Sequence, residues 1–307
     1  MRKKQLQSNA ILLLTALIWG LAFVAQSIAM DYIRPFTFNG IRSIIGGLVL
    51  LPVIAVMKKF STSKRECYNP QDRDRVKEIF HSMEVKGGIL CGLVLFVTSN
   101  LQQFGIMYSS PGKAGFITAL YILIVPIIGL FLGKKVMVRI WGCVGVALVG
   151  VFLLCVTEQL TIEKGDILLI LCAIGCSVHI LVVDYFSPKA NGPIMSCIQF
   201  FVCGVLSLIG MGIFEQPVLS DVLKAWQPIL YAGVLSSGVA YTLQIICQKN
   251  TSPIVASLLM SMESVFAYLG SVVILGQNLS TREAIGSVLV FGAIIIAQLP
   301  SKQRIAA

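Results

Sequence analysis

The chain has 307 residues, of which 56% are hydrophobic and only 12% are charged, and its mean hydropathy is +0.86. Soluble globular proteins carry about 25% charged residues, so this composition excludes a water-facing domain of this size and predicts an integral membrane protein. The net charge of +10 does not indicate nucleic-acid binding, because most basic residues fall in connections between apolar segments.

Ten apolar segments follow one another along the chain. A helix that crosses a bilayer needs about 20 mostly apolar residues. The N-terminal segment is long enough to span and has a counterpart later in the chain, so we expect a retained first helix and not a cleaved signal peptide. The predicted fold class is an all-α integral membrane protein with ten transmembrane helices, at residues 9–30, 36–57, 87–108, 113–132, 137–156, 165–185, 193–213, 227–248, 253–275 and 283–299.

The basic residues orient these helices. With an even number of spans, most Lys and Arg residues lie on the side of the N-terminus, which predicts cytoplasmic N- and C-termini in a multi-pass protein of the cell membrane. The longest connection, 58–86, is the most basic. Within it, Val76, Ile79, Phe80 and Met83 recur at helical spacing, which leaves open an amphipathic helix on the inner membrane surface or a solvated basic loop.

The two halves of the chain resemble each other. At a shift of 142 residues, Leu101-Gln102 aligns with Leu243-Gln244 and Ser110-Pro111 with Ser252-Pro253. The predicted repeats are residues 1–157, which include the basic connection 58–86, and residues 158–307. Each repeat holds five spans, so the second crosses in the opposite sense to the first. Inverted repeats are a transporter architecture, with a substrate site near the midplane where the halves meet.

Short motifs also resemble a known family. The stretches ALIWGLAFV (Ala16 to Val24) and PFTFNGIRS (Pro35 to Ser43), with Ser-Pro at the start of the fourth and ninth helices, resemble the drug/metabolite transporter superfamily of the EamA type. The resemblance implies a ten-helix permease. In that family the ninth helix often reads Glu-Pro, whereas Ser264 follows Glu263 here. Gly133-Lys134 and Gly276-Gln277 stand where Gly-Glu often closes the fourth and ninth helices.

Ionisable residues within the spans are functional candidates, because they are costly in hydrocarbon. Arg42 is the candidate to bind a substrate carboxylate. Glu263 has three interpretations: a partner of Arg42, an isolated carboxyl that favours its protonated form and becomes the proton-coupling candidate, or a group that only fastens helices. His179 either binds substrate or bonds a neighbouring helix.

Polar and aromatic residues of several spans complete the predicted substrate site. Asn100 and Gln103 share one helix face, and Tyr241 and Gln244 share another in the matching helix of the second half. Pro126 is expected to kink the fourth helix, either as a hinge or as a packing feature. The predicted substrate-binding residues are Trp19, Asn39, Arg42, Asn100, Gln103, Thr118, Tyr121, His179, Gln199, Tyr241, Gln244, Glu263 and Tyr268.

Motifs for catalysis, metal binding or cofactor binding are not found in the sequence. The nine cysteines form no Cys-x-x-Cys pair, and Cys172 and Cys176 lack the histidine or carboxylate partners of a zinc site. No protease motif or phosphate-binding loop is present, so we expect no catalytic residues, no metal, no cofactor and no enzyme activity.

The resulting prediction is a secondary transporter for a small amino-acid-like or other amphiphilic metabolite. It would work by alternating access, with proton-coupled efflux as one form. The alternative is a receptor or scaffold that keeps the transporter fold without transport. The predicted partners are the small-molecule substrate and the lipid bilayer, with no nucleic acid. The substrate, the direction of transport, the coupling ion and the oligomeric state are not predicted.

Overall fold

The computed structural model describes residues 2–62, 70–109, 111–133, 136–155, 164–275 and 280–298, and these residues form helices and turns without a β-strand. The helices are α1 (Arg2–Met30), α2 (Pro35–Thr62), α3 (Pro70–Met107), α4 (Pro111–Ala119), α5 (Tyr121–Phe131), α6 (Val138–Cys155), α7 (Lys164–Phe186), α8 (Gly192–Phe214), α9 (Leu219–Lys224), α10 (Trp226–Leu230), the π-helix η1 (Tyr231–Tyr241), α11 (Thr242–Gln248), α12 (Pro253–Met260), α13 (Glu263–Leu275) and α14 (Thr281–Gln298).

Proline and short polar residues start several helices. Pro35 and Pro253 are the first residues of α2 and α12, where the missing N–H group has no intrahelical partner to lose. Asn191 and Ser252 cap α8 and α12, each accepting a hydrogen bond of 3.4 Å from the backbone three residues later. The predicted starts of α2, α8 and α12 therefore lie close to the observed ones.

In the part of the chain that the structure describes, seven helical segments are long and apolar enough to cross a membrane. Three shorter apolar helices, at 117–131, 138–153 and 284–297, accompany them. The chain is thus an all-helical, multi-pass membrane protein.

Both ends of the predicted connection 58–86 are helical, because α2 continues to Thr62 and α3 already begins at Pro70, while the apolar spans end at Met57 and begin at Ser82. No glycine or proline interrupts α3 before Gly87, so the helix extends well before its apolar part. The side chains of 70–81 lie outside the described residues, so the proposed amphipathic face there stays a prediction.

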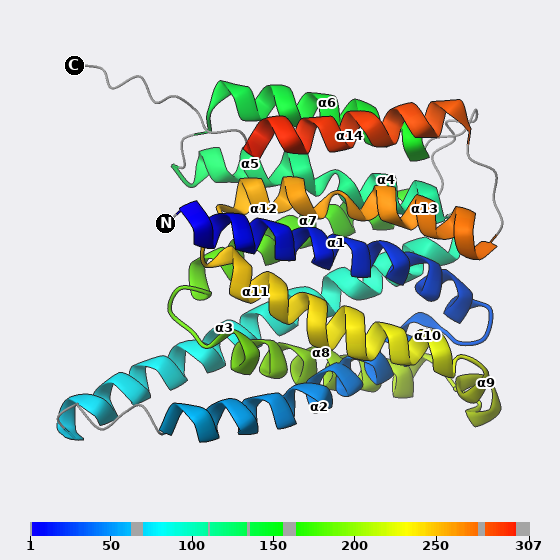
Figure 1. The fold of residues 1–307 in the computed structure, drawn as a ribbon. Coiled ribbons are helices and arrows are strands. Elements are labelled where there is room, and N and C mark those ends of the chain that lie inside the picture. Colours follow the sequence, from blue (N-terminus) through cyan, green and yellow to red (C-terminus); the bar gives the residue numbers. More distant parts are fainter. Residues whose placement is uncertain are drawn as a thin grey trace, which may run out of the picture.

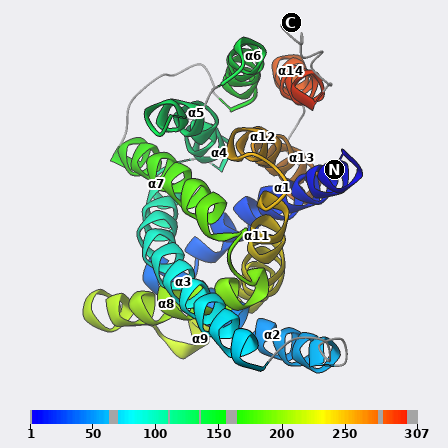
Figure 2. The ribbon, with the colours of Figure 1, turned by 90° about the vertical axis from the view of Figure 1, so that its left-hand side faces the viewer.

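The long helices lie roughly side by side, and α1 begins at the same end of the bundle where α14 ends (Figure 1). Viewed from that end, α6 and α14 stand together at one edge, and α2, α3 and α8 lie at the opposite edge (Figure 2). The short helix α9 lies at the other end of the bundle (Figure 1). The central helices, α1, α7 and α11 to α13, lie between the two edges.

Helix contacts between the two halves occur in matching pairs. Helix α2 packs on α8, and α6 packs on α14. Helix α3 packs on α7. The segment α10–η1–α11, which corresponds to α3 in the second half, packs on α1 in the same way. Likewise α1 contacts α13, and α7 contacts α4 and α5.

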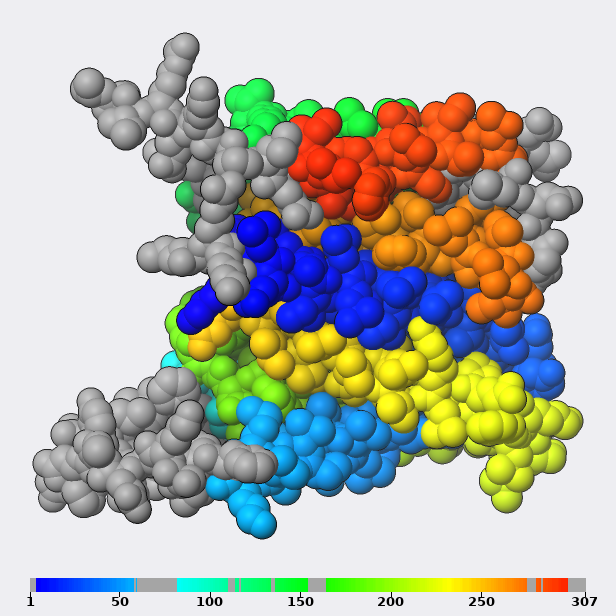
Figure 3. Space-filling view, viewed as in Figure 1, coloured from blue at the N-terminus to red at the C-terminus, as the bar shows by residue number. Residues whose placement is uncertain are grey.

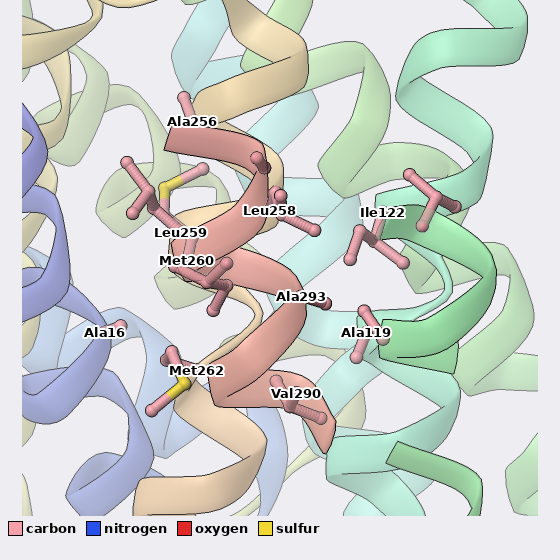
Figure 4. Close-up of a cluster of buried hydrophobic side chains, with 14 of the residues drawn as sticks. Ala16, Ala119, Ile122, Ala256, Leu258, Leu259, Met260, Met262, Val290 and Ala293 are labelled. Atoms are coloured by element: carbon pink, nitrogen blue, oxygen red, sulfur yellow. The ribbon is translucent and has the colours of Figure 1, made fainter. Parts of the chain in front are cut away.

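The largest cluster of buried apolar side chains joins α1, α4 to α7 and α11 to α14. Figure 4 shows part of it, where Leu258 and Met260 of α12 lie near Ile122 of α5 and Ala293 of α14. This cluster fixes α12 and α13 between α1 and the α6/α14 pair.

The outer surface of the helices is apolar. Leu48 on α2 and Ile167 on α7 are about half exposed, as expected for side chains that face lipid. Figure 3 shows one such face, formed by α14, α12–α13, α1, η1–α11 and α2 in succession.

Candidate functional site

A small cavity lies between helices of both halves. It encloses about 60 Å³, which is room for a few water molecules. The residues that line it come from α1, α2, α3, α4, α5, α7, η1, α11, α12 and α13, and they are Trp19, Phe23, Gln26, Arg42, Leu95, Thr98, Ser99, Gln102, Thr118, Tyr121, Cys176, His179, Ile180, Ser236, Tyr241, Gln244, Met260 and Glu263.

Arg42 provides the positive charge of the cavity. Its Nε donates a hydrogen bond of 2.8 Å to Oδ1 of Asn39, and its guanidinium carbon lies 5.3 Å from the centre of the Phe38 ring. Among the described residues, its two terminal amino groups have no hydrogen-bonding partner. Because the buried guanidinium is held through Nε alone, its two terminal amino groups are available to bind an anion.

A chain of amides holds Asn39 in place. Its Nδ2 donates to Oδ1 of Asn100 at 3.0 Å and to the backbone carbonyl of Ser99 at 3.1 Å. Asn100 in turn donates to Oγ of Ser207 on α8 at 3.2 Å. Helices α2, α3 and α8 therefore orient Arg42 together.

Glu263 provides the carboxyl group of the cavity. It is the first residue of α13, and its Oε1 accepts a hydrogen bond of 3.0 Å from the hydroxyl of Tyr121, the first residue of α5. A carboxylate in the first turn of a helix is stabilised by the helix dipole. Although Arg42 and Glu263 line the same cavity, these two residues form no ion pair. The cavity therefore presents the two groups separately.

Aromatic rings form one wall of the cavity. Tyr241, the last residue of η1, lies 4.6 Å from the ring of Trp19 and 5.7 Å from that of His179, measured between ring centres. The Trp19 indole donates to the carbonyl of Ser236 at 3.4 Å. Nε2 of His179 and Oε1 of Gln199 are 3.2 Å apart, which fits a protonated Nε2 as donor.

Several polar atoms around the cavity are buried without a hydrogen-bonding partner among the described residues. They are Oε1 of Gln26, Oγ1 of Thr98, Oγ1 of Thr118 and Oε1 of Gln244, and all four residues line the cavity. Leaving such a group unsatisfied costs about 1–3 kcal/mol. The lining is therefore suited to water or to a polar ligand.

The structure brings most of the predicted site residues to this cavity. Eight line it directly: Trp19, Arg42, Thr118, Tyr121, His179, Tyr241, Gln244 and Glu263. Asn39 and Gln199 contact the lining residues Arg42 and His179 instead. Asn100 bonds Asn39, and Gln103 donates to the carbonyl of Gln26 at 3.2 Å. Tyr268 does not line the cavity; it belongs to the apolar cluster.

Some cavity residues were not predicted, and helical spacing is the signal that points to them. Trp19, Phe23 and Gln26 are four and three residues apart and share a face of α1. On α3, Thr98 and Gln102 are four residues apart and share a face of the helix.

A metal centre finds no support among the residues that the structure describes, because no three His, Cys, Asp or Glu side chains are grouped there. The Sγ atoms of Cys172 and Cys176 are 3.9 Å apart, and both cysteines are free thiols.

Comparisons with known proteins agree with this architecture. The chain is 29% identical over 297 residues to a protein of Archaeoglobus fulgidus described as an uncharacterized transporter, covering 96% of this chain and 87% of that protein. It is 24% identical to another uncharacterized transporter, of Clostridium kluyveri, covering 89% of this chain and 85% of the relative. A crystal structure with 19% sequence identity has the same fold, with a TM-score of 0.73 over 95% of this chain and 97% of that one.

The family itself is identified by two separate matches. The model of the EamA-like transporter family matches residues 7–156 and again residues 163–298. Together these matches cover nearly all of the described helices. The chain therefore belongs to the EamA-like transporter family.

Proposed function

We propose that this transporter moves a small amphiphilic metabolite, with an amino-acid-like zwitterion as the best match, through the cavity between its halves. The observation that carries the proposal is the pair of separated groups, the Arg42 guanidinium and the Glu263 carboxyl, on the wall of one cavity. A substrate carboxylate would meet the open fork of Arg42, and a substrate ammonium would meet Glu263. The rings of Trp19 and Tyr241 would cover the apolar part.

Alternating access between two inverted five-helix repeats, 1–157 and 158–307, is the proposed mechanism. The matching helix contacts of the two halves and the two separate family matches support it. The α6/α14 pair supports it too, because each helix places an arginine from its start against the end of the other. Arg139 of α6 donates to the carbonyl of Ala297 of α14. Arg282 of α14 lies over the ring of Phe152 of α6. A cavity of about 60 Å³ is too small for a metabolite, so the halves would have to move apart to admit one.

Proton coupling through Glu263 and the membrane orientation are further parts of the proposal. Glu263 is buried, and among the described residues its carboxyl is bonded only to the neutral hydroxyl of Tyr121, so a proton and a substrate ammonium would compete for the same carboxyl. The excess of basic residues on one side supports cytoplasmic termini in the cell membrane.

The test is transport by purified protein in proteoliposomes, with substrates first selected from a panel of amino acids and related metabolites by their effect on the melting temperature. We expect Arg42→Gln to lower uptake about 10- to 100-fold, because a charge-assisted hydrogen bond contributes roughly 1.5–3 kcal/mol. Glu263→Gln should abolish accumulation driven by a pH gradient while substrate exchange continues. Arg34→Gln and Asp31→Asn make the same chemical changes at exposed positions and should transport as the wild type does.

Two results would contradict the proposal. Folded Arg42→Gln and Glu263→Gln proteins with wild-type transport would remove the assigned roles. Tight ligand binding without flux of any candidate would indicate the receptor or scaffold instead.

A further inference from the structure

Two apolar helical segments are interrupted at matching places. The first breaks at Leu120, between α4 and α5, and the second at 261–262, between α12 and α13. Tyr121 and Glu263, which start the two following helices, are separated by the same 142 residues that relate the two halves in sequence. The interruption is therefore a shared feature of the two halves.

Each interruption is a tight turn in which a backbone amide donates to the carbonyl three residues earlier. The amide of Leu120 bonds the carbonyl of Ile117 at 3.2 Å, and the amide of Met262 bonds the carbonyl of Leu259 at 3.3 Å. Short stretches of this geometry inside a helix often mark hinges.

The sequence produces the two turns in different ways. Pro126 lies inside α5, and its ring displaces the carbonyl four residues earlier, at Ile122. The break at Leu120 lies six residues before Pro126, so the kink expected at Pro126 itself stays a prediction. In the second half, the Ser261 hydroxyl donates to the carbonyl of Leu258 at 2.8 Å, a contact that bends helices.

Two hydrogen bonds join the helices that flank these turns. The Tyr121 hydroxyl donates to Glu263 at 3.0 Å, and the Ser264 hydroxyl donates to the carbonyl of Gly115 on α4 at 3.3 Å. The first residue of α5 and the first turn of α13 are therefore tied across the boundary between the halves.

The surroundings leave little freedom at this junction. Tyr121 is 3% exposed and Glu263 is 5% exposed. Helix α1 packs closely behind, since a Cβ added at Gly20 would lie 2.7 Å from the carbonyl oxygen of Glu263. The other titratable or charged groups that line the same cavity are Arg42, Cys176, His179 and Tyr241, and none of them forms a hydrogen bond to Glu263 among the described contacts.

We propose that Tyr121 is a positioning residue whose hydrogen bond to Glu263 latches the two helix interruptions together, so that they open and close as one unit. While the bond is intact, neither turn bends alone. A further step rests on the proposed function: a substrate ammonium that binds Glu263 displaces the Tyr121 hydroxyl and releases both turns at once. The role of Tyr121 is then to hold the carboxyl in its site and to transmit its occupation to both halves.

Hydrogen exchange of the backbone amides, measured by mass spectrometry on the full chain in lipid nanodiscs without substrate, tests the latch. Tyr121→Phe keeps the ring and removes only the hydroxyl. We expect exchange to rise about tenfold in segment 117–124 and equally in segment 257–266, because losing a buried bond to a carboxyl costs that order of stability. Tyr231→Phe is the matched control, since it removes a hydroxyl that donates to the carbonyl of Ile18 at 3.0 Å, and neither of these residues lines the cavity. It should leave both segments unchanged.

Variants of Glu263 make the test independent of transport. Glu263→Gln retains an oxygen that accepts from Tyr121, so exchange in both segments should stay within about twofold of the wild type. Glu263→Ala should raise exchange in both segments as Tyr121→Phe does, with no further rise in the double variant. A Tyr121→Phe protein in which only its own turn, 117–124, exchanges faster would overturn the latch. Failure of the proposed function would appear separately, as absent flux in proteoliposomes with this exchange pattern intact.

Discussion

The α6/α14 pair and the helices around the cavity differ in the kinds of residue that they bury. Helices α6 and α14 pack mainly on each other, with a Cβ added at Gly150 only 2.7 Å from the carbonyl oxygen of Gly286, and no described residue of either helix lines the cavity. The cavity helices instead bury Arg42, Glu263, His179 and a set of amides and hydroxyls. Polar groups that are costly in a membrane are thus concentrated around the cavity between the two halves.

An Arg→Lys change in each region gives the largest expected contrast. Arg42→Lys keeps the charge but loses the Nε bond to Asn39 and the planar fork, so uptake in proteoliposomes should fall about 10-fold or more. Arg282→Lys keeps a cation near the Phe152 ring and should change uptake less than about twofold. Equal losses in both variants would erase the distinction between the two regions.

Glycine-to-alanine changes compare how tightly the helices of the two regions pack, through the free energy of unfolding. A Cβ at Gly20 would lie 2.5 Å from Cβ of Phe266 on α13, whereas a Cβ at Gly142 on α6 would meet nothing within 4 Å. Gly20→Ala should lower the free energy of unfolding by about 1–3 kcal/mol, as overpacked contacts do. Gly142→Ala should leave it unchanged or raise it by up to about 1 kcal/mol through helix propensity. Denaturant titration in detergent measures both, and a stable Gly20→Ala protein would show that α1 and α13 are loosely packed.

Threonine-to-valine changes compare a bonded hydroxyl outside the cavity with an unbonded one that lines it. Thr37 donates to Oε2 of Glu215 at 2.6 Å, so Thr37→Val should cost roughly 1–3 kcal/mol of unfolding free energy. Thr118 has a buried hydroxyl without a partner among the described residues. Thr118→Val should therefore be neutral or slightly stabilising but should weaken substrate affinity. A large loss of stability in Thr118→Val would mean that its hydroxyl is already satisfied within the protein.

The sequence predicts the helices well because their ends are set locally. Proline at the first position of α2 and α12, and the caps Asn191 and Ser252, act within one turn. The π-helix η1 and the breaks between α4 and α5 and between α12 and α13 were not predicted as such. Tertiary contacts accompany them: a Cβ added at Gly46 of α2 would lie only 2.7 Å from Cβ of Ser237 in η1.

The candidate site was predictable in its residue types but not in its partners. Depth and polarity select Arg42 and Glu263, yet whether they pair depends on how α2 and α13 lie around the cavity, and Glu263 bonds Tyr121 instead. Tyr121 and Tyr268 are both aromatic residues in the middle of matching segments. Both belong to the apolar cluster, and only the packing of their helices brings Tyr121 to the cavity as well.

Labelling of Cys176, a native cysteine that lines the cavity, tests the central claim most directly. In a protein whose other cysteines are replaced by alanine, a small membrane-impermeant thiol reagent is applied to right-side-out and to inside-out vesicles. If the two halves enclose an aqueous site that opens to each side in turn, Cys176 reacts from both sides and a transported substrate slows both reactions. A folded protein in which Cys176 reacts from neither side, or in which substrate protects it from neither, would contradict the account.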